Sequence, residues 1–283
     1  MIARSWWCAV AISACTSWHV ASAQSWRTVE SARQLRDSTE HQLHVRYAAG
    51  RIDVAATNAP VLYAMTLRYD ESSSSPLHSY DAESRLLTLG VDGQTERFAR
   101  NMDDKSRGEM RLSLSRAVPL DIDLALGATK AQLDLGGLNL LALHLQSGAS
   151  ETLVDFSVPN RGRMRSLDVD VGAASFEARN LANANVAAVR VHGGVGSVEL
   201  DFGGQWTQDM SVEVSLTLGK LALHVPRDVG VRVEVQKFLA SFDQQGLEKR
   251  GDAYYSENWD RAKFHLRVRA ETTFGGIELD RAN

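Results

Sequence analysis

Two pairs of aspartates are the residues whose spacing best fits hydrolytic chemistry. Asp121-x-Asp123 and Asp168-x-Asp170 each place two carboxylates on one face of an extended strand, about 7 Å apart. A glycosidase uses two carboxylates at such a separation. The alternative is that these acids lie on a solvated strand face, and the charge pattern described below already explains Asp168 and Asp170 in that way. We therefore expect no catalytic residue in this chain.

Histidines offer the other chemistry to consider, and His41-x-x-His44 is the closest approach to metal-ligand spacing. A zinc site needs three or four ligands, so we interpret this pair as two polar residues at a helix-to-strand junction. No HExxH, GxSxG or GxxxxGK[ST] motif is present. Residues 193–196 are glycine-rich, but they join two strands and lack the helix N-terminus that holds a phosphate. We expect no metal and no cofactor. The other histidines considered are spread along the sequence: His78, His144, His192, His224 and His265.

Aromatic residues gather near the C-terminus, in a long excursion between about residues 247 and 263. Tyr254, Tyr255 and Trp259 are the residues we single out there. Rings on an exposed loop can bind a partner or a sugar, and long loops in compact domains are often functional. The favoured alternative is a cap, because the open end of a stack of strands exposes unpaired edges and apolar core.

The first residues have the order of a secretory signal peptide. A basic Arg4 precedes an apolar run at residues 6–14, and Ala21-Ser22-Ala23 precedes Gln24. The run is too short to cross a bilayer as a helix. We expect cleavage after Ala23 and export to the periplasm or the outside of the cell. Both cysteines lie in the removed segment, so the mature chain would have no thiol to oxidise.

Cys15 has a second interpretation. Ile12-Ser13-Ala14-Cys15 resembles the bacterial lipobox, in which the cysteine is acylated and becomes the mature N-terminus. Lipidation at Cys15 is the alternative to soluble export.

Composition excludes several classes of function. The chain has 283 residues, 44% of them hydrophobic and 23% charged, and a formal net charge of -4. This is an ordinary globular composition, which excludes disorder, collagen and a polytopic membrane protein. An acidic balance gives no attraction to a phosphate backbone, so we expect no nucleic-acid partner.

The elements that carry these residues are strands in a repeating pattern. Residues 26–41 could form a short surface helix, and residues 71–76 and 99–109 are polar connections. Almost everything else alternates with period two, which is typical of half-buried strands. From about residue 110 a glycine recurs every 21 to 24 residues between pairs of short strands, and such a period predicts a solenoid of stacked rungs. The recurring glycines are Gly127, Gly148, Gly172, Gly196 and Gly219.

Outward residues of the second strand in each repeat alternate in charge from one repeat to the next. Aligning repeats by their apolar residues gives two columns, and opposite charges on neighbouring strands stabilise by about 0.2 to 1 kcal/mol. We predict that Arg190 lies beside Asp168 and Glu213. The first column is Ala142, Asp168, Arg190, Glu213, Arg232 and His265, and the second is His144, Asp170, His192, Ser215, Glu234 and Arg267.

The order of the repeats resembles the toast-rack domain of cell-wall-active antibiotic response (LiaF-like) bacterial proteins. The similarity covers the chain from about residue 42 to the end. The motifs that carry it include residues 118–122, 133–138, 147–150, 180–184, 194–202 and 275–279. The resemblance implies a non-enzymatic envelope protein. The best-known branch regulates an envelope-stress system through a membrane-embedded N-terminal half, from which this chain departs because it has a signal peptide and no transmembrane helix.

Together these features predict an all-β chain built around a single-stranded β-solenoid of the toast-rack type with a capped C-terminal end. We divide it into a signal peptide (1–23), an N-terminal segment (24–41), a strand-rich part (42–109) that continues the same stack, and the solenoid (110–283). We expect a non-catalytic envelope protein that binds another envelope protein or a cell-surface component, with a link to the envelope-stress response. The alternatives are a β-helix enzyme acting on cell-wall or extracellular glycans, and a surface adhesin or scaffold.

Overall fold

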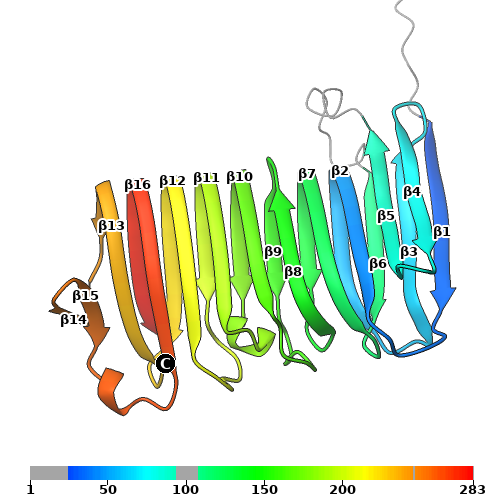
Figure 1. Cartoon of the computed structure of the whole chain (residues 1–283). Helices are drawn as coiled ribbons and strands as arrows, with labels where there is room; N and C mark the ends of the chain where they lie inside the picture. Colours follow the sequence, from blue (N-terminus) through cyan, green and yellow to red (C-terminus); the bar gives the residue numbers. More distant parts are fainter. Residues whose placement is uncertain (1–24, 94–107, 245, 283) are drawn as a thin grey trace, which may run out of the picture.

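The computed structural model describes residues 25–93, 108–244 and 246–282. The signal peptide with Ala23, the lipidation candidate Cys15 and most of the 99–109 connection lie outside the described residues. Within those residues the fold is all-β, and sixteen strands form one mixed sheet. The strands stand side by side in a long row (Figure 1).

The interior of the row consists of long strands paired in parallel. Each one bends near its middle, and most pair along both halves with the same neighbour. Where a neighbouring unit consists of two short strands, the two halves pair with different strands. The first half of β10 pairs with β8 and its second half with β9. We call one such bent unit a rung, and β8 and β9 together make one. The rungs are β2 (His41–Thr57), β7 (Pro119–Asp134), β8 (Asn139–Ser147) with β9 (Glu151–Asp155), β10 (Ser166–Arg179), β11 (Ala188–Asp201), β12 (Met210–Pro226), β16 (His265–Ala282) and β13 (Gly230–Phe242).

The hydrophobic core lies between the two halves of each rung. In β10 the alternating residues Leu167, Val169, Val171, Phe176 and Ala178 are all buried. Period-two alternation puts these side chains on one face of the strand and polar ones on the other. The sequence pieces recognised as separate first and second strands are therefore two halves of one bent strand.

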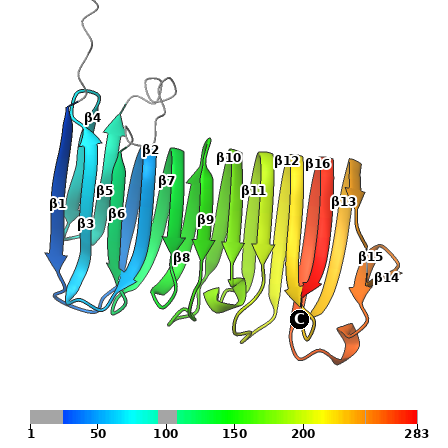
Figure 2. The same ribbon diagram turned by 180° about the vertical axis from the view of Figure 1, so that it is seen from behind.

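The order of the rungs departs from the order of the chain at the C-terminal end. β16 pairs with β12 on one side and with β13 on the other. The last strand is therefore inserted between two earlier ones, and Figure 2 shows it there from behind. A register that assumes chain order, as our predicted charge columns do, is wrong at this end.

Antiparallel strands complete the N-terminal end. β5 (Leu86–Gly93) and β6 (Glu109–Ser115) pair with the two halves of β2. β4 (Ser74–Asp81) pairs antiparallel with β5, and β3 (Val61–Asp70) pairs antiparallel with β6. β1 (Trp26–Gln34) then pairs antiparallel with β3. Pairing of β2 with β7 confirms that this part continues the stack.

Two local predictions are corrected here. The helix expected at residues 26–41 is wrong: residues 26–34 form β1, whose ladder with β3 provides the hydrogen bonds that a helix would have made internally. The loop expected at residues 71–76 is a turn only at 71–73, because β4 begins at Ser74 and pairs with β5.

The connecting loops lie along the edge of the stack that is opposite the bends (Figure 1). Buried asparagines fix this edge by bonding between rungs. Asn183 donates to the carbonyl of Phe156 at 2.8 Å and accepts from the backbone N–H of Gln205 at 2.8 Å. The short 3-10 helix η3 (Leu181–Ala184) lies in one of these loops. No helix among the described residues is long and apolar enough to cross a membrane.

Candidate interaction surface

The bends of the rungs form a continuous surface along one edge of the stack (Figure 1). The pairing register aligns their residues in columns that run from rung to rung. We call the column at the crest of the bends the crest column. In rung order it reads Ala49, Ala128, Ala149, Ala173, Val195, Leu218, Phe274 and Leu239. Ala149 lies between β8 and β9, and its place in the column follows from the pairs of Ser147 and Glu151 on either side of it.

Close approach of neighbouring backbones explains the glycines beside the crest. Gly219 has a φ of +158°, and a Cβ there would lie 1.9 Å from the carbonyl oxygen of Gly196. Gly275 repeats the geometry one rung on, at a φ of +131° and 1.7 Å from the oxygen of Gly219. A side chain at either position would displace the adjacent rung, because Cβ atoms do not approach backbone oxygens so closely. These glycines lie within continuous strands, so the predicted turns are bends.

Small residues line two hollows beside the crest, which begin on the N-terminal rung β2 and extend as far as β12 and β11. One hollow of about 850 Å³ runs from β2 to β12, and a second of about 860 Å³ lies on the other side of the crest. The first is floored by Gly127, Gly148 and Gly172, and the second by Ala128, Ala149 and Ala173. We call the crest from Ala49 to Ala173 the hollow half.

Large apolar side chains raise the crest on the C-terminal rungs. Val195, Leu218, Phe274 and Leu239 occupy successive positions of the crest column and are 51%, 47%, 41% and 64% exposed. Phe238 is 76% exposed, and its ring lies edge-to-face with that of Phe274, with the ring centroids 6.5 Å apart. We call these five residues the apolar ridge. Contiguous exposed apolar patches mark interaction sites more often than single residues do.

The flat face next to the bends carries an alternating charge ladder. The prediction for Arg190 is confirmed: it pairs in register with Asp168 and Glu213, and its guanidinium contacts the Asp168 carboxylate at 3.0 Å. The register corrects the rest of the column, because Asp168 lies beside His144 and Glu213 beside an arginine of β16. The observed ladder is His44, Asp123, His144, Asp168, Arg190, Glu213, Arg269 and Glu234.

The aspartate pairs belong to this face. Asp121 accepts a hydrogen bond from Arg165 at 3.0 Å, and the Asp170 carboxylate lies 3.8 Å from His144. Asp168 is held by Arg190, and Asp123 pairs in register with His44 and His144, so all four carboxylates have basic neighbours. Hydrogen bonding from Arg269, together with Arg232, lowers the pKa of Glu234 at the end of the ladder. These contacts favour a structural role for the acids.

His41 and His44 lie on opposite faces of β2. His41 is buried, where its ring bonds the carbonyl of Thr39 at 2.8 Å and the hydroxyl of Tyr80 at 3.3 Å. His44 is on the outer face, in the charge ladder. Residues three apart on a strand point in opposite directions, so the two rings do not share a site.

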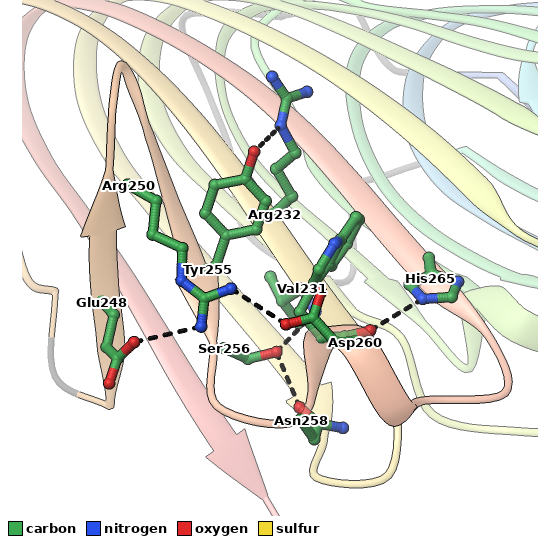
Figure 3. Close-up of polar contacts among 10 residues, drawn as sticks. Val231, Arg232, Glu248, Arg250, Tyr255, Ser256, Asn258, Asp260 and His265 are labelled. Atoms are coloured by element: carbon green, nitrogen blue, oxygen red, sulfur yellow. Dashed lines mark hydrogen bonds and ion pairs between the residues drawn. The ribbon is translucent and has the colours of Figure 1, made fainter.

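The aromatic segment of the long excursion folds as a hairpin against the last rung. β14 (Leu247–Arg250) pairs with β15 (Ala253–Ser256), which pairs antiparallel with β13, and η4 (Trp259–Arg261) follows. The Tyr255 hydroxyl accepts a hydrogen bond from Arg232 at 2.9 Å (Figure 3). The ring centroids of Tyr255 and Trp259 are 5.4 Å apart. The Tyr254 ring packs on Phe242, with the ring centroids 4.9 Å apart.

The hairpin is tied to the stack by polar contacts as well. Arg250 bridges Glu248 and Asp260, each at 3.2 Å, and Ser256 accepts from the backbone N–H of Val231 (Figure 3). The segment therefore covers the first half of the end rung β13, which is part of what the cap interpretation expects, while Phe238 and Leu239 in its second half stay exposed. A partner-binding role for Tyr254, Tyr255 and Trp259 stays a prediction.

Comparison with known families identifies the chain. The model of the N-terminal domain of toast_rack, DUF2154, matches residues 21–177, more than half of the sequence. The chain belongs to the toast-rack family. This confirms the resemblance inferred from the repeats.

Two solved structures have a similar arrangement of strands. A proposed cell adhesion protein from Clostridium sporogenes is 16% identical, with a TM-score of 0.46, covering 90% of this chain and all of that one. A proposed adhesin from Bacteroides fragilis is 10% identical, with a TM-score of 0.44, covering 90% of this chain and 97% of that one. Likeness at this level does not transfer a binding partner. No curated protein matches the sequence significantly.

Sequence analysis missed the apolar ridge of this toast-rack protein. Its residues fall in stretches that looked like turns, such as Gly-Val-Gly at 194–196 and Leu-Thr-Leu-Gly at 216–219. Aligning the repeats on their bend glycines would have placed Val195, Leu218 and Phe274 in one column, because each directly precedes a glycine. The signal was present, but it lay next to the glycines and not in the strands.

Proposed function

We propose that this toast-rack protein is a non-catalytic module of the cell envelope or cell surface that binds a macromolecule through its bend surface. The observation that carries the proposal is the apolar ridge. Water-exposed side chains at 41% to 76% exposure, aligned on adjacent rungs, favour burial against a partner.

The rest of the structure supports a binding role in preference to an enzymatic one. Carboxylates that could form a glycosidase pair contact arginine and histidine side chains on neighbouring rungs. Both ends of the stack are covered by antiparallel strands, which fits a finished binding module whose interior rungs form a β-solenoid.

Export and an envelope-stress role belong to the same proposal. The signal-peptide pattern before Gln24 and the family resemblance support them. Fractionation with an intact-mass measurement tests export: a soluble chain starting at Gln24 supports cleavage after Ala23, and an acylated chain starting at Cys15 supports a lipid anchor.

Photo-crosslinking in living cells tests the binding role. A photoreactive residue replaces Thr217, which is exposed beside the ridge, and in a matched control replaces Val158, which is 44% exposed and lies outside the bends. We expect adducts from position 217 that disappear in a Leu218→Ser/Phe274→Ser background, and none from position 158. Adducts equal at both positions, or none from position 217, would rule out binding through this surface.

A further inference from the structure

The bend surface is complementary to itself when one copy is turned end to end against another. We propose that the apolar ridge packs onto the hollow half of a second copy of this chain, in a two-fold symmetric dimer with antiparallel stacks. This rests on the proposed function, since it names the occupant of the same surface.

Shape provides the first argument. In this dimer the eight rungs of one copy face those of the other in reverse order, about the midpoint between β10 and β11. Each large crest residue then meets a small one on the other copy. The pairs across the dimer would be Ala173 with Val195, Ala149 with Leu218, Ala128 with Phe274, and Ala49 with Leu239. All four large side chains of the crest face alanines. A two-fold interface uses the same patch on both subunits, so this match is made twice.

The other two-fold arrangement does not give such a match. With the stacks parallel, ridge would face ridge, and Phe274 would meet Phe274 while the alanines faced each other across two hollows. Unfilled space at an interface forfeits van der Waals contacts. The antiparallel arrangement instead sets each large crest side chain over a crest alanine, where the bend surface is low.

Charges beside the crest provide the second argument. The same reversal places Asp170 of one copy opposite His192 of the other, and Glu151 opposite Lys220. Arg46 of one copy, on β2, would lie one rung away from Glu271 of the other copy, on β16. Opposite charges thus meet on both flanks of the crest, which favours this register over a shifted one.

The size of the surface sets the expected strength. Eight rungs at about 4.8 Å spacing and six residues across each bend give a strip of roughly 34 by 20 Å. Its projected area, roughly 700 Å², is at the lower end of specific interfaces, which bury about 800 Å² of accessible surface per partner. We therefore expect a dimer that dissociates on dilution through the micromolar range.

Sedimentation equilibrium of the full-length chain over a range of concentrations tests the assembly. We expect dimers at high concentration and at least a tenfold weaker dimer for Leu239→Asp. The matched control is Val158→Asp, which adds the same charge at an exposed valine outside the bends and leaves the dimer unchanged. A chain that is monomeric at every concentration, or a dimer weakened equally by both variants, would overturn the inference.

Disulfide trapping tests the orientation. In a chain whose Cys8 and Cys15 are serine, Ala149→Cys and Leu218→Cys variants are mixed and oxidised. We expect crosslinks between the two variants and none from Leu218→Cys alone. Crosslinking of Leu218→Cys with itself would show ridge against ridge and overturn the antiparallel arrangement. If photo-crosslinking from position 217 captures another macromolecule while the chain stays monomeric, the binding role survives and the dimer does not.

Discussion

The hollow and raised halves of the bend surface share one backbone path and differ in what projects from it. On both, the rungs pair in register on either side of the bend, although the rung made of β8 and β9 is interrupted at residues 148–150. In the hollow half the crest residue is alanine, and in the raised half it is valine, leucine or phenylalanine. Repetition of the backbone therefore determines where the surface lies, and a single column of side chains determines whether it is a groove or a ridge.

The largest expected effect compares two individual bend glycines, Gly275 on the raised half and Gly148 on the hollow half. Gly275→Ala would place a Cβ 1.7 Å from the oxygen of Gly219 at a φ that disfavours alanine, whereas the nearest atom to a Cβ at Gly148 is the oxygen of Gly127 at 3.2 Å. We expect Gly275→Ala to lower the free energy of unfolding by about 4 kcal/mol or more, and Gly148→Ala by about 1 kcal/mol or less. Urea unfolding followed by circular dichroism measures both. Equal losses would contradict the difference.

A second prediction compares the loss of stability on truncating a core residue with that on truncating a ridge residue. Phe176 is buried between the halves of β10, whereas Phe238 is 76% exposed. Phe176→Ala should cost about 3 to 5 kcal/mol of stability, because it removes buried area and leaves a cavity. Phe238→Ala should change stability by no more than about 0.5 kcal/mol. If Phe238→Ala in the isolated monomer were as destabilising as Phe176→Ala, the ridge would be part of the core and not a binding surface.

A substitution in the charge ladder tests whether the flat face contributes as much to the free energy of unfolding as the bends do. Arg190→Glu would place a third acid between Asp168 and Glu213 on adjacent rungs. We expect a loss of about 1 kcal/mol at low salt that shrinks in about 1 M NaCl, because exposed charges are screened. The control is Arg36→Glu, on an exposed segment outside the strands. A loss that salt does not reduce would indicate a packing role for Arg190.

The smallest expected effect is a pH dependence at the raised end of the ladder. Hydrogen bonding from Arg269, with help from Arg232, lowers the pKa of Glu234 in the folded state. The ionised carboxylate therefore stabilises the fold above the pKa of an unfolded glutamate, about 4.3, and this contribution is lost as pH falls through the lower folded value.

Unfolding free energies of the parent chain and Glu234→Gln at about pH 6 and about pH 3 measure this contribution. At the higher pH the unfolding free energy of the parent should exceed that of the variant by a few tenths of a kcal/mol, because the partner Arg269 is 60% exposed and water screens the pair. At the lower pH the difference should shrink. A difference that grows on acidification would mean that the sign of the shift is wrong.

The interior repeats could be predicted because their signals are local. Alternation of apolar residues in each strand and a glycine at each bend recur at a nearly fixed period, and this was sufficient to place Arg190 beside Asp168 and Glu213. Prediction failed where pairing between distant segments decides the outcome. Residues 26–34 could have formed a helix, and only the antiparallel partner β3 makes them a strand.

Sequence alone determined that this chain is all-β, that its strands stack in a repeating register, and that its long aromatic excursion covers one end. Those properties follow from side-chain periodicity and from glycines that permit close backbone approach. Tertiary structure alone decided that β16 enters between β12 and β13, and hence that Phe274 lies between Leu218 and Leu239. The ridge is continuous because strands far apart in the chain pair with each other, and no local pattern encodes which strand takes which place in the row.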